Sequence, residues 1–147
     1  MGTLRYFNIL IVTLTVATFL RGQTTALAGP CKTEIDSVTK QLVYTAADIE
    51  PLNEGGENKL RKQFEAKVTT NNIPIDINNY DPNVIVAFIV DKDGTIKGER
   101  VVNDKTHKVG EQMLDVIKSF KWTPAKCNGK FVPMILRRKM IIDISEQ

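Results

Sequence analysis

The 147-residue sequence has few of the residues that build common catalytic and metal sites. It contains one histidine, His107, and no cysteine lies near it, so a zinc site lacks ligands. Neither G-x-x-x-x-G-K-[ST] nor G-x-G-x-x-G is present, and no serine or cysteine lies in a recognisable nucleophile motif. Asp91 and Asp93 begin a calcium-like spacing, but Val102 stands at the twelfth position, where the loop needs a glutamate. The sequence therefore predicts a protein that is not an enzyme, with no metal and no cofactor.

An excess of charge of one sign is also missing from most of the chain. The net charge of +3 includes Arg5 and Arg21, the two charged residues of the segment 1–28. The remaining 119 residues carry 18 basic and 17 acidic side chains. Proteins that bind nucleic acids usually show a basic face, so this balance predicts no nucleic-acid partner. A chain of that length typically forms one domain with one modest core.

Residues 1–28 have the organisation of a secretory signal peptide. Arg5 precedes an uncharged run over 6–20, and Ala26-Leu27-Ala28 forms a small-residue cleavage site. The alternative is an uncleaved membrane anchor, but a span needs about 20 apolar residues and this run stops at Arg21. We therefore expect export of the chain.

Export bears on the two cysteines, Cys31 and Cys127. In an oxidising compartment an even number of cysteines favours a disulfide, which would join the mature N-terminus to a late loop. Spacing alone does not determine pairing, so two free thiols at unrelated positions remain an equal alternative.

The pattern of apolar residues predicts an α+β domain after residue 55. Apolar residues at helical spacing predict helices over Glu57–Val68 and Lys108–Phe120. A β-branched run, a turn at 91–94 and a more polar partner predict a β-hairpin. The order is helix-strand-strand-helix-strand, with strands over Val84–Val90, Thr95–Val102 and Phe131–Ile144. We expect a small three-stranded, largely antiparallel sheet with two helices packed on one face. Residues 29–54 are ambiguous between helix and strand and form an N-terminal extension.

The last predicted strand carries charge in an unusual position. Arg137 and Lys139 lie on its polar face, whereas Arg138 interrupts the apolar face. Either the Arg138 head group reaches out of that face, or a β-bulge shifts the register. The charges either protect a sheet edge from aggregation or guide an extended peptide onto it, and both interpretations stay open.

Residues 55–144 contain a series of short motifs in a fixed order. The motifs are Gly55-Gly56, Asn72-Ile73-Pro74, the strand and turn over 86–96, Val101-Val102, the helix end at 116–120, Trp122-Thr123-Pro124-Ala125-Lys126, Asn128-Gly129-Lys130 and Val132-Pro133. In this order and spacing they resemble the C-terminal domain of TonB-type energy transducers. The sequence departs from that family at Ile73, where the family usually has tyrosine, and at Asn83, where it usually has glycine.

This resemblance implies a periplasmic domain, here residues 55–147, that binds an extended peptide at the edge of its last strand. The peptide would come from an outer-membrane transporter or another periplasmic protein. The implied peptide-facing residues are Met134, Ile135, Leu136, Arg137, Arg138, Lys139, Met140, Ile141 and Ile142.

The family's transducers also have a membrane anchor and a long proline-rich spacer. This chain has only six scattered prolines. We therefore predict a periplasmic binding or adaptor module linked to outer-membrane transport. The alternatives are a short energy transducer that keeps its membrane anchor, and a structural homodimer formed by paired sheet edges.

Overall fold

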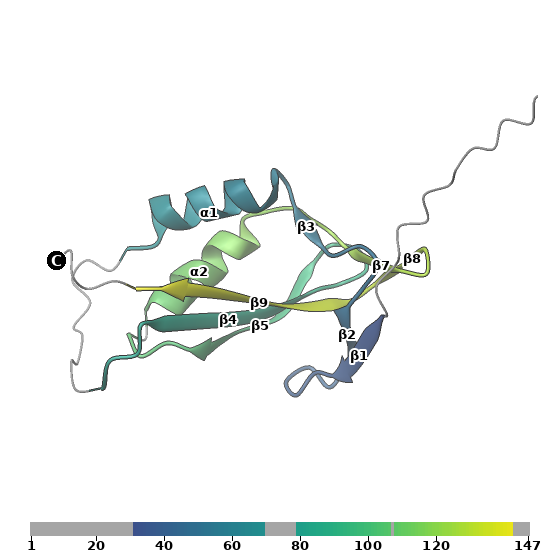
Figure 1. Cartoon of the computed structure of the whole chain (residues 1–147), viewed down its shortest axis with the longest axis horizontal. Coiled ribbons are helices and arrows are strands. Elements are labelled where there is room, and N and C mark those ends of the chain that lie inside the picture. Colours follow the sequence, from purple (N-terminus) through teal and green to yellow (C-terminus); the bar gives the residue numbers. More distant parts are fainter. Residues whose placement is uncertain (1–30, 70–78, 107, 143–147) are drawn as a thin grey trace, which may run out of the picture.

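The computed structural model describes residues 31–69, 79–106 and 108–142. The predicted signal peptide, His107 and the Asn72-Ile73-Pro74 motif lie outside these residues. The fold is α+β, as predicted, with two helices and a mixed sheet (Figure 1). The predicted number of strands in the sheet was wrong, because the sheet has five strands in the order β1-β2-β9-β4-β5.

The observed elements follow the predicted order after residue 55 and add short strands before and between them. The pairs β3–β6 and β7–β8 form two small antiparallel ladders outside the main sheet. The bounds are β1 Lys32–Ile35, β2 Leu42–Ala46, β3 Leu52–Asn53, α1 Gly56–Lys67, β4 Asn83–Val90, β5 Ile96–Asn103, α2 Val109–Lys118, β6 Trp122–Thr123, β7 Ala125–Cys127, β8 Lys130–Val132 and β9 Met134–Ile141.

The β4–β5 hairpin forms at its predicted place. The Gly94 N–H donates to the Asp91 carbonyl at 2.9 Å, which closes the turn. Gly94 has a φ of +84°, and a Cβ there would lie 2.3 Å from the Trp122 carbonyl oxygen. Glycine is therefore required at this position both by the backbone conformation and by the close approach of another segment.

The main core lies between the sheet and the two helices. Trp122 is buried, its ring centroid is 5.2 Å from that of Phe88, and its Nε1–H donates to the Ile117 carbonyl at 3.1 Å. Trp122 thus joins the end of α2 to β4. Other buried members of this core are Leu60, Val84, Val86, Val90, Val109, Met113, Val116, Ile117, Met134 and Leu136.

A second, smaller core lies on the opposite face of the sheet. It consists of Val43, Ile89 and Ile135. Val43 belongs to the β1–β2 hairpin, so this hairpin packs against the sheet face that the helices leave uncovered. We call this face the outer face. The segment treated in the sequence as an N-terminal extension therefore contributes two strands to the sheet.

The two cysteines are brought together at one end of the molecule. Their sulfur atoms lie at disulfide-bonding distance, and their Cα atoms are 6.2 Å apart across a separation of 96 residues. Cys127 ends β7, and the following turn has positive φ at Asn128 (50°) and Gly129 (74°), as a two-residue hairpin requires. Of the two alternatives, the structure therefore shows the Cys31–Cys127 disulfide. This bond links the residue before β1 to the β7–β8 hairpin.

Candidate functional site

The strand predicted to bind a peptide, β9, is not an edge of the sheet. It pairs with β4 over all eight residues from Met134 to Ile141, and β2 lies on its other side. The prediction of a final edge strand was therefore wrong, because it did not include strands from residues 32–46. However, β2 pairs with β9 only at Tyr44 and Met134. From Leu136 to Ile141, no second strand pairs with β9 among the described residues.

The direction of the main-chain groups along β9 follows from its hydrogen bonds. The Ile142 N–H donates to the Pro82 carbonyl at 2.9 Å, so that pair is hydrogen-bonded. In an antiparallel ladder such pairs alternate, so even-numbered residues of β9 direct their N–H and C=O groups to β4 and odd-numbered residues direct theirs away. The Tyr44 N–H donates to the Pro133 carbonyl at 2.8 Å on the other side, in agreement with this alternation.

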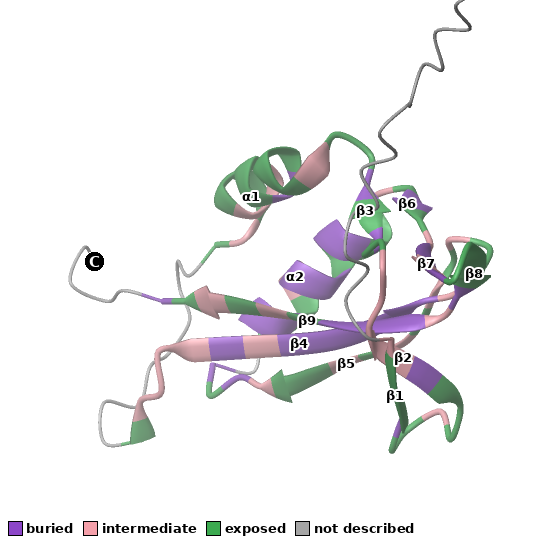
Figure 2. Ribbon diagram, turned by 45° about the vertical axis from the view of Figure 1, so that its right-hand side comes forward, coloured by how far each residue is buried: buried purple, intermediate pink, exposed green. Residues whose placement is uncertain are grey.

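Three residues consequently present main-chain groups to the unpaired side of β9: Arg137, Lys139 and Ile141. We call the range 137–141 the free segment. Its three odd-numbered side chains are exposed, and Ile141 is 67% exposed. Figure 2 shows exposed and intermediate positions alternating towards the end of β9. The free segment therefore combines outward main-chain groups with accessible side chains on the outer face.

The other predicted site residues have structural roles. Met134, Leu136 and Ile142 are buried in the main core, and Met140 packs against it. Ile135 is buried in the small core beneath the β1–β2 hairpin. These residues support the strand and are not accessible in the way the peptide-facing prediction required.

Arg138 differs from its two charged neighbours. Its side chain lies on the helix-facing side, where its guanidinium forms an ion pair with Glu57 in the first turn of α1. The register between β4 and β9 is continuous from Asn83 to Val90, so the alternative of a bulge at this residue is wrong. The head group reaches out of the apolar face instead, as the other alternative proposed. Arg138 therefore links β9 to α1, and its charge is already partnered.

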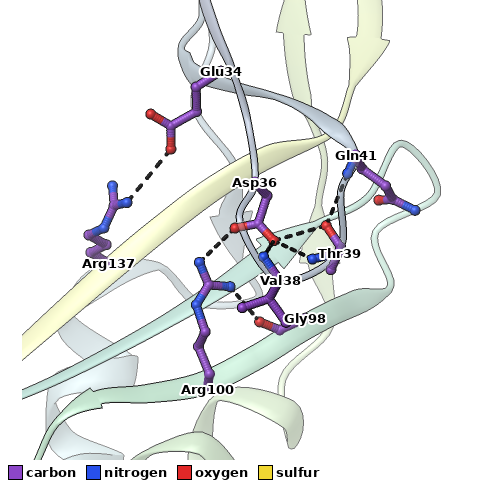
Figure 3. A network of polar contacts seen from close by, with 8 residues as sticks. All are labelled: Glu34, Asp36, Val38, Thr39, Gln41, Gly98, Arg100 and Arg137. Atoms are coloured by element: carbon purple, nitrogen blue, oxygen red, sulfur yellow. Dashed lines mark hydrogen bonds and ion pairs between the residues drawn. The ribbon is translucent and has the colours of Figure 1, made fainter.

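A polar network fixes the β1–β2 hairpin on the outer face (Figure 3). Arg100 of β5 donates to Asp36 at 2.6 Å, and Arg137 of β9 lies 3.6 Å from Glu34. The Asp36 carboxylate also accepts hydrogen bonds from the N–H and hydroxyl groups of Thr39, at 2.8 and 2.9 Å. The hairpin is thereby held against both β5 and β9.

The environment of Asp36 favours its ionised form. The main-chain N–H of Thr39 and the guanidinium of Arg100 lower the pKa of Asp36 from 3.8 to about 2, against the opposing effect of burial. Asp36 is only 1% exposed. Its charge therefore depends on these partners, and it belongs to the structure of the hairpin turn and not to an open site.

Lys139 is the cation of the free segment with the fewest contacts to the rest of the described structure. Its side chain is exposed, and it forms no ion pair with another described residue. Arg137 has Glu34 as a partner at a long distance, with the Arg137 side chain still 56% exposed. Exposed pairs of this kind contribute little, so Arg137 remains able to exchange its partner.

One group of candidate metal ligands occurs among the described residues: Cys31, Asp48 and Cys127. The two sulfurs lie at disulfide-bonding distance, and thiolates are the form that binds metals. One Asp48 carboxylate oxygen accepts the Asn128 N–H at 2.7 Å and so supports the β7–β8 turn. This group is therefore explained by the structure of the turn.

Comparison with known proteins supplies no relative. No protein-family model matches the chain, no curated protein matches it, and no solved structure matches it. The resemblance to TonB C-terminal domains stays a prediction from the sequence pattern. Within residues 31–69, 79–106 and 108–142, no helix is long and apolar enough to cross a membrane.

Proposed function

We propose that this protein is an exported, periplasmic TonB C-terminal-like module that binds an extended peptide by β-augmentation at the free segment of β9. The peptide belongs to an outer-membrane transporter or to another periplasmic protein. One observation carries the proposal: β9 is paired along its whole length with β4 but only at Met134 with β2. The remaining main-chain groups are those that an added strand would use.

The free segment offers a defined number of hydrogen-bonding groups. Each of Arg137, Lys139 and Ile141 presents one N–H and one C=O on the unpaired side of β9. The range 137–141 is about 17 Å long at about 3.4 Å per residue. Because each main-chain hydrogen bond contributes only about 0.5–1.5 kcal/mol net, a peptide also needs side-chain contacts to bind well.

Charge on the outer face defines the favoured peptide. Arg137 and Lys139 lie two residues apart on one face of β9, so their side chains lie side by side. A peptide with acidic side chains at alternate positions would place them beside these two cations. The sequence also predicted Arg138 as part of this group. This prediction was wrong, because Arg138 is paired with Glu57 on the other face of the sheet.

The binding test uses a synthetic octapeptide of alternating glutamate and valine, measured by titration calorimetry. Lys139→Pro removes one outward N–H, and Lys139→Ala, the matched control, removes the same charge but keeps the N–H. We expect Lys139→Pro to abolish measurable binding and Lys139→Ala to weaken it severalfold. The same peptide with alternate N-methylated residues should not bind, since it cannot form the ladder. Equal affinities of the two variants would contradict β-augmentation.

Amide hydrogen exchange tests the geometry without any peptide. The N–H groups of Arg137, Lys139 and Ile141 should exchange rapidly, because they point away from β4. Those of Leu136, Arg138 and Met140 should exchange slowly. Adding the octapeptide should slow the first set selectively. Equal protection of both sets in the free protein would show that the unpaired side of β9 is already occupied.

A further inference from the structure

The strand β1 forms the outermost edge of the sheet on the side opposite β5. All four of its residues are exposed, and no described strand pairs with its outer side. The Asp36 N–H donates to the Gln41 carbonyl at 2.9 Å, so residue 36 directs its main-chain groups towards β2. By alternation, the groups of Thr33 and Ile35 point away from β2. The outer side of β1 therefore presents a short, regular set of main-chain donors and acceptors.

The other edge of the sheet is protected from pairing. Along β4 and β5, the partner changes from Asn103 to Val101 between Ile85 and Val86. A second shift between Ala87 and Ile89 also places an additional residue in β5. Bulges of this kind twist an edge strand and interrupt its outward hydrogen-bonding groups. In contrast, the irregularity beside β1 skips a residue of β2 and leaves β1 itself regular.

The charges of β1 are arranged in a self-complementary way. Lys32 and Glu34 lie on the same face, one on each side of Thr33. In an antiparallel pair about a twofold axis at Thr33, Lys32 of each copy lies opposite Glu34 of the other. If the register of the second β1 strand is shifted by two residues, Glu34 lies opposite Glu34, which is repulsive. If it is shifted by one residue, main-chain groups that point outward in one copy face groups that point inward in the other, so the hydrogen bonds cannot form. Charged side chains that only protect an edge from aggregation need no such complementary register.

We propose that a second copy of this chain pairs with β1 in this register and joins two five-stranded sheets into one continuous sheet. Thr33 lies opposite Thr33 at the axis, a favourable cross-strand pair. Ile35, which is 61% exposed, lies opposite Cys31 of the second copy and adds apolar contact at each end. This dimer uses the main-chain groups of β1 that point away from β2, whereas the peptide proposed for the free segment uses those of β9. The two sites share one side-chain contact, because Glu34 of β1 also pairs with Arg137 of β9.

The test is analytical ultracentrifugation of the purified exported protein at concentrations from about 10 μM to 1 mM, a range suited to small interfaces. Lys32→Glu and Glu34→Lys each replace two attractive pairs with two repulsive ones. We expect each variant alone to raise the dimer dissociation constant at least about tenfold. An equimolar mixture of the two variants should associate again, because every charge then meets an opposite charge.

A second pair of variants tests the main-chain contacts. Thr33→Pro removes an outward N–H at the axis and should abolish the dimer, whereas Thr33→Ala keeps the N–H and should retain it. Urea unfolding of each variant shows whether the domain is still folded. A monomer at every concentration would overturn the proposal. A dimer that persists in Thr33→Pro, or a mixture of charge variants that does not associate, would overturn it equally.

Discussion

Removal of the Cys31–Cys127 disulfide should cost this domain a large part of its stability. The bond closes a loop with a separation of 96 residues, for which the chain-entropy relation gives about 4.7 kcal/mol at 25 °C. With an m-value of about 2 kcal/mol per M in urea, the unfolding midpoint should fall by about 2 M. The double variant Cys31→Ala and Cys127→Ala measures this change, and reduced wild-type protein is the matched control that keeps both side chains.

The same experiment shows where the stability is lost. Val43 is the only buried side chain of β1 and β2, so few apolar contacts hold the hairpin once the disulfide is gone. The Tyr44 amide, which donates to Pro133, should therefore lose protection from hydrogen exchange well before the amides of β4 do. A loss below about 1 kcal/mol with unchanged protection of Tyr44 would refute the reasoning. It would mean that the ion pairs and the small core are sufficient to hold the hairpin.

Two further predictions concern single residues. The pKa of Asp36 is about 2 in the folded protein and near 3.8 when unfolded, so its charge contributes about 2 kcal/mol above pH 5. That contribution is lost as the pH falls from about 4 to 2, and urea unfolding of Asp36→Asn should lack this part of the pH dependence; an unchanged profile would contradict the assignment. Gly94→Ala should destabilise more than Gly129→Ala. Both have positive φ, but only at Gly94 does a carbonyl oxygen, that of Trp122, lie 2.3 Å from the added Cβ. Thermal unfolding of the two variants measures this difference, and equal melting temperatures would contradict the close approach.

The elements with strong periodicity could be predicted from the sequence. The β4–β5 hairpin combines a continuous β-branched run with an Asp-Gly turn, and α2 has one unbroken apolar stripe. In both elements the local preference and the buried face agree, so tertiary contacts only reinforce what the pattern indicates. In β9, Met134, Leu136 and Met140 share the apolar face, and Arg138 alone breaks the alternation there.

The β1–β2 hairpin could not be predicted in the same way. Its strands bury one side chain, Val43, so no alternating apolar pattern marks them. The contacts that hold it, Asp36 with Arg100 and Cys31 with Cys127, join residues 64 and 96 positions apart. Such contacts leave no signal at short range. This missing hairpin is also why β9 was assigned to an edge.

Arg138 shows a limit of sequence reasoning at a single position. The break in alternation was visible, but Glu57, its partner, lies 81 residues earlier in the chain. A pattern within one strand cannot distinguish a charge that faces another element from one that faces a ligand. Once Glu57 is known to be the partner of Arg138, the cations of the free segment that face the outer side are Arg137 and Lys139.

The path of the chain after β2 determines how much of β9 stays available. Tyr44 and Met134 are paired in parallel, so the residues that follow Tyr44 would lie beside the free segment if β2 continued along β9. They leave β9 instead, because Ile49 pairs with Lys126 and β3 pairs with β6. If β2 followed β9, it would occupy the outward groups of Arg137 and Lys139. The pairing of residues 49–53 with the segment that follows α2 is therefore the reason that the second half of β9 has outward groups for another strand.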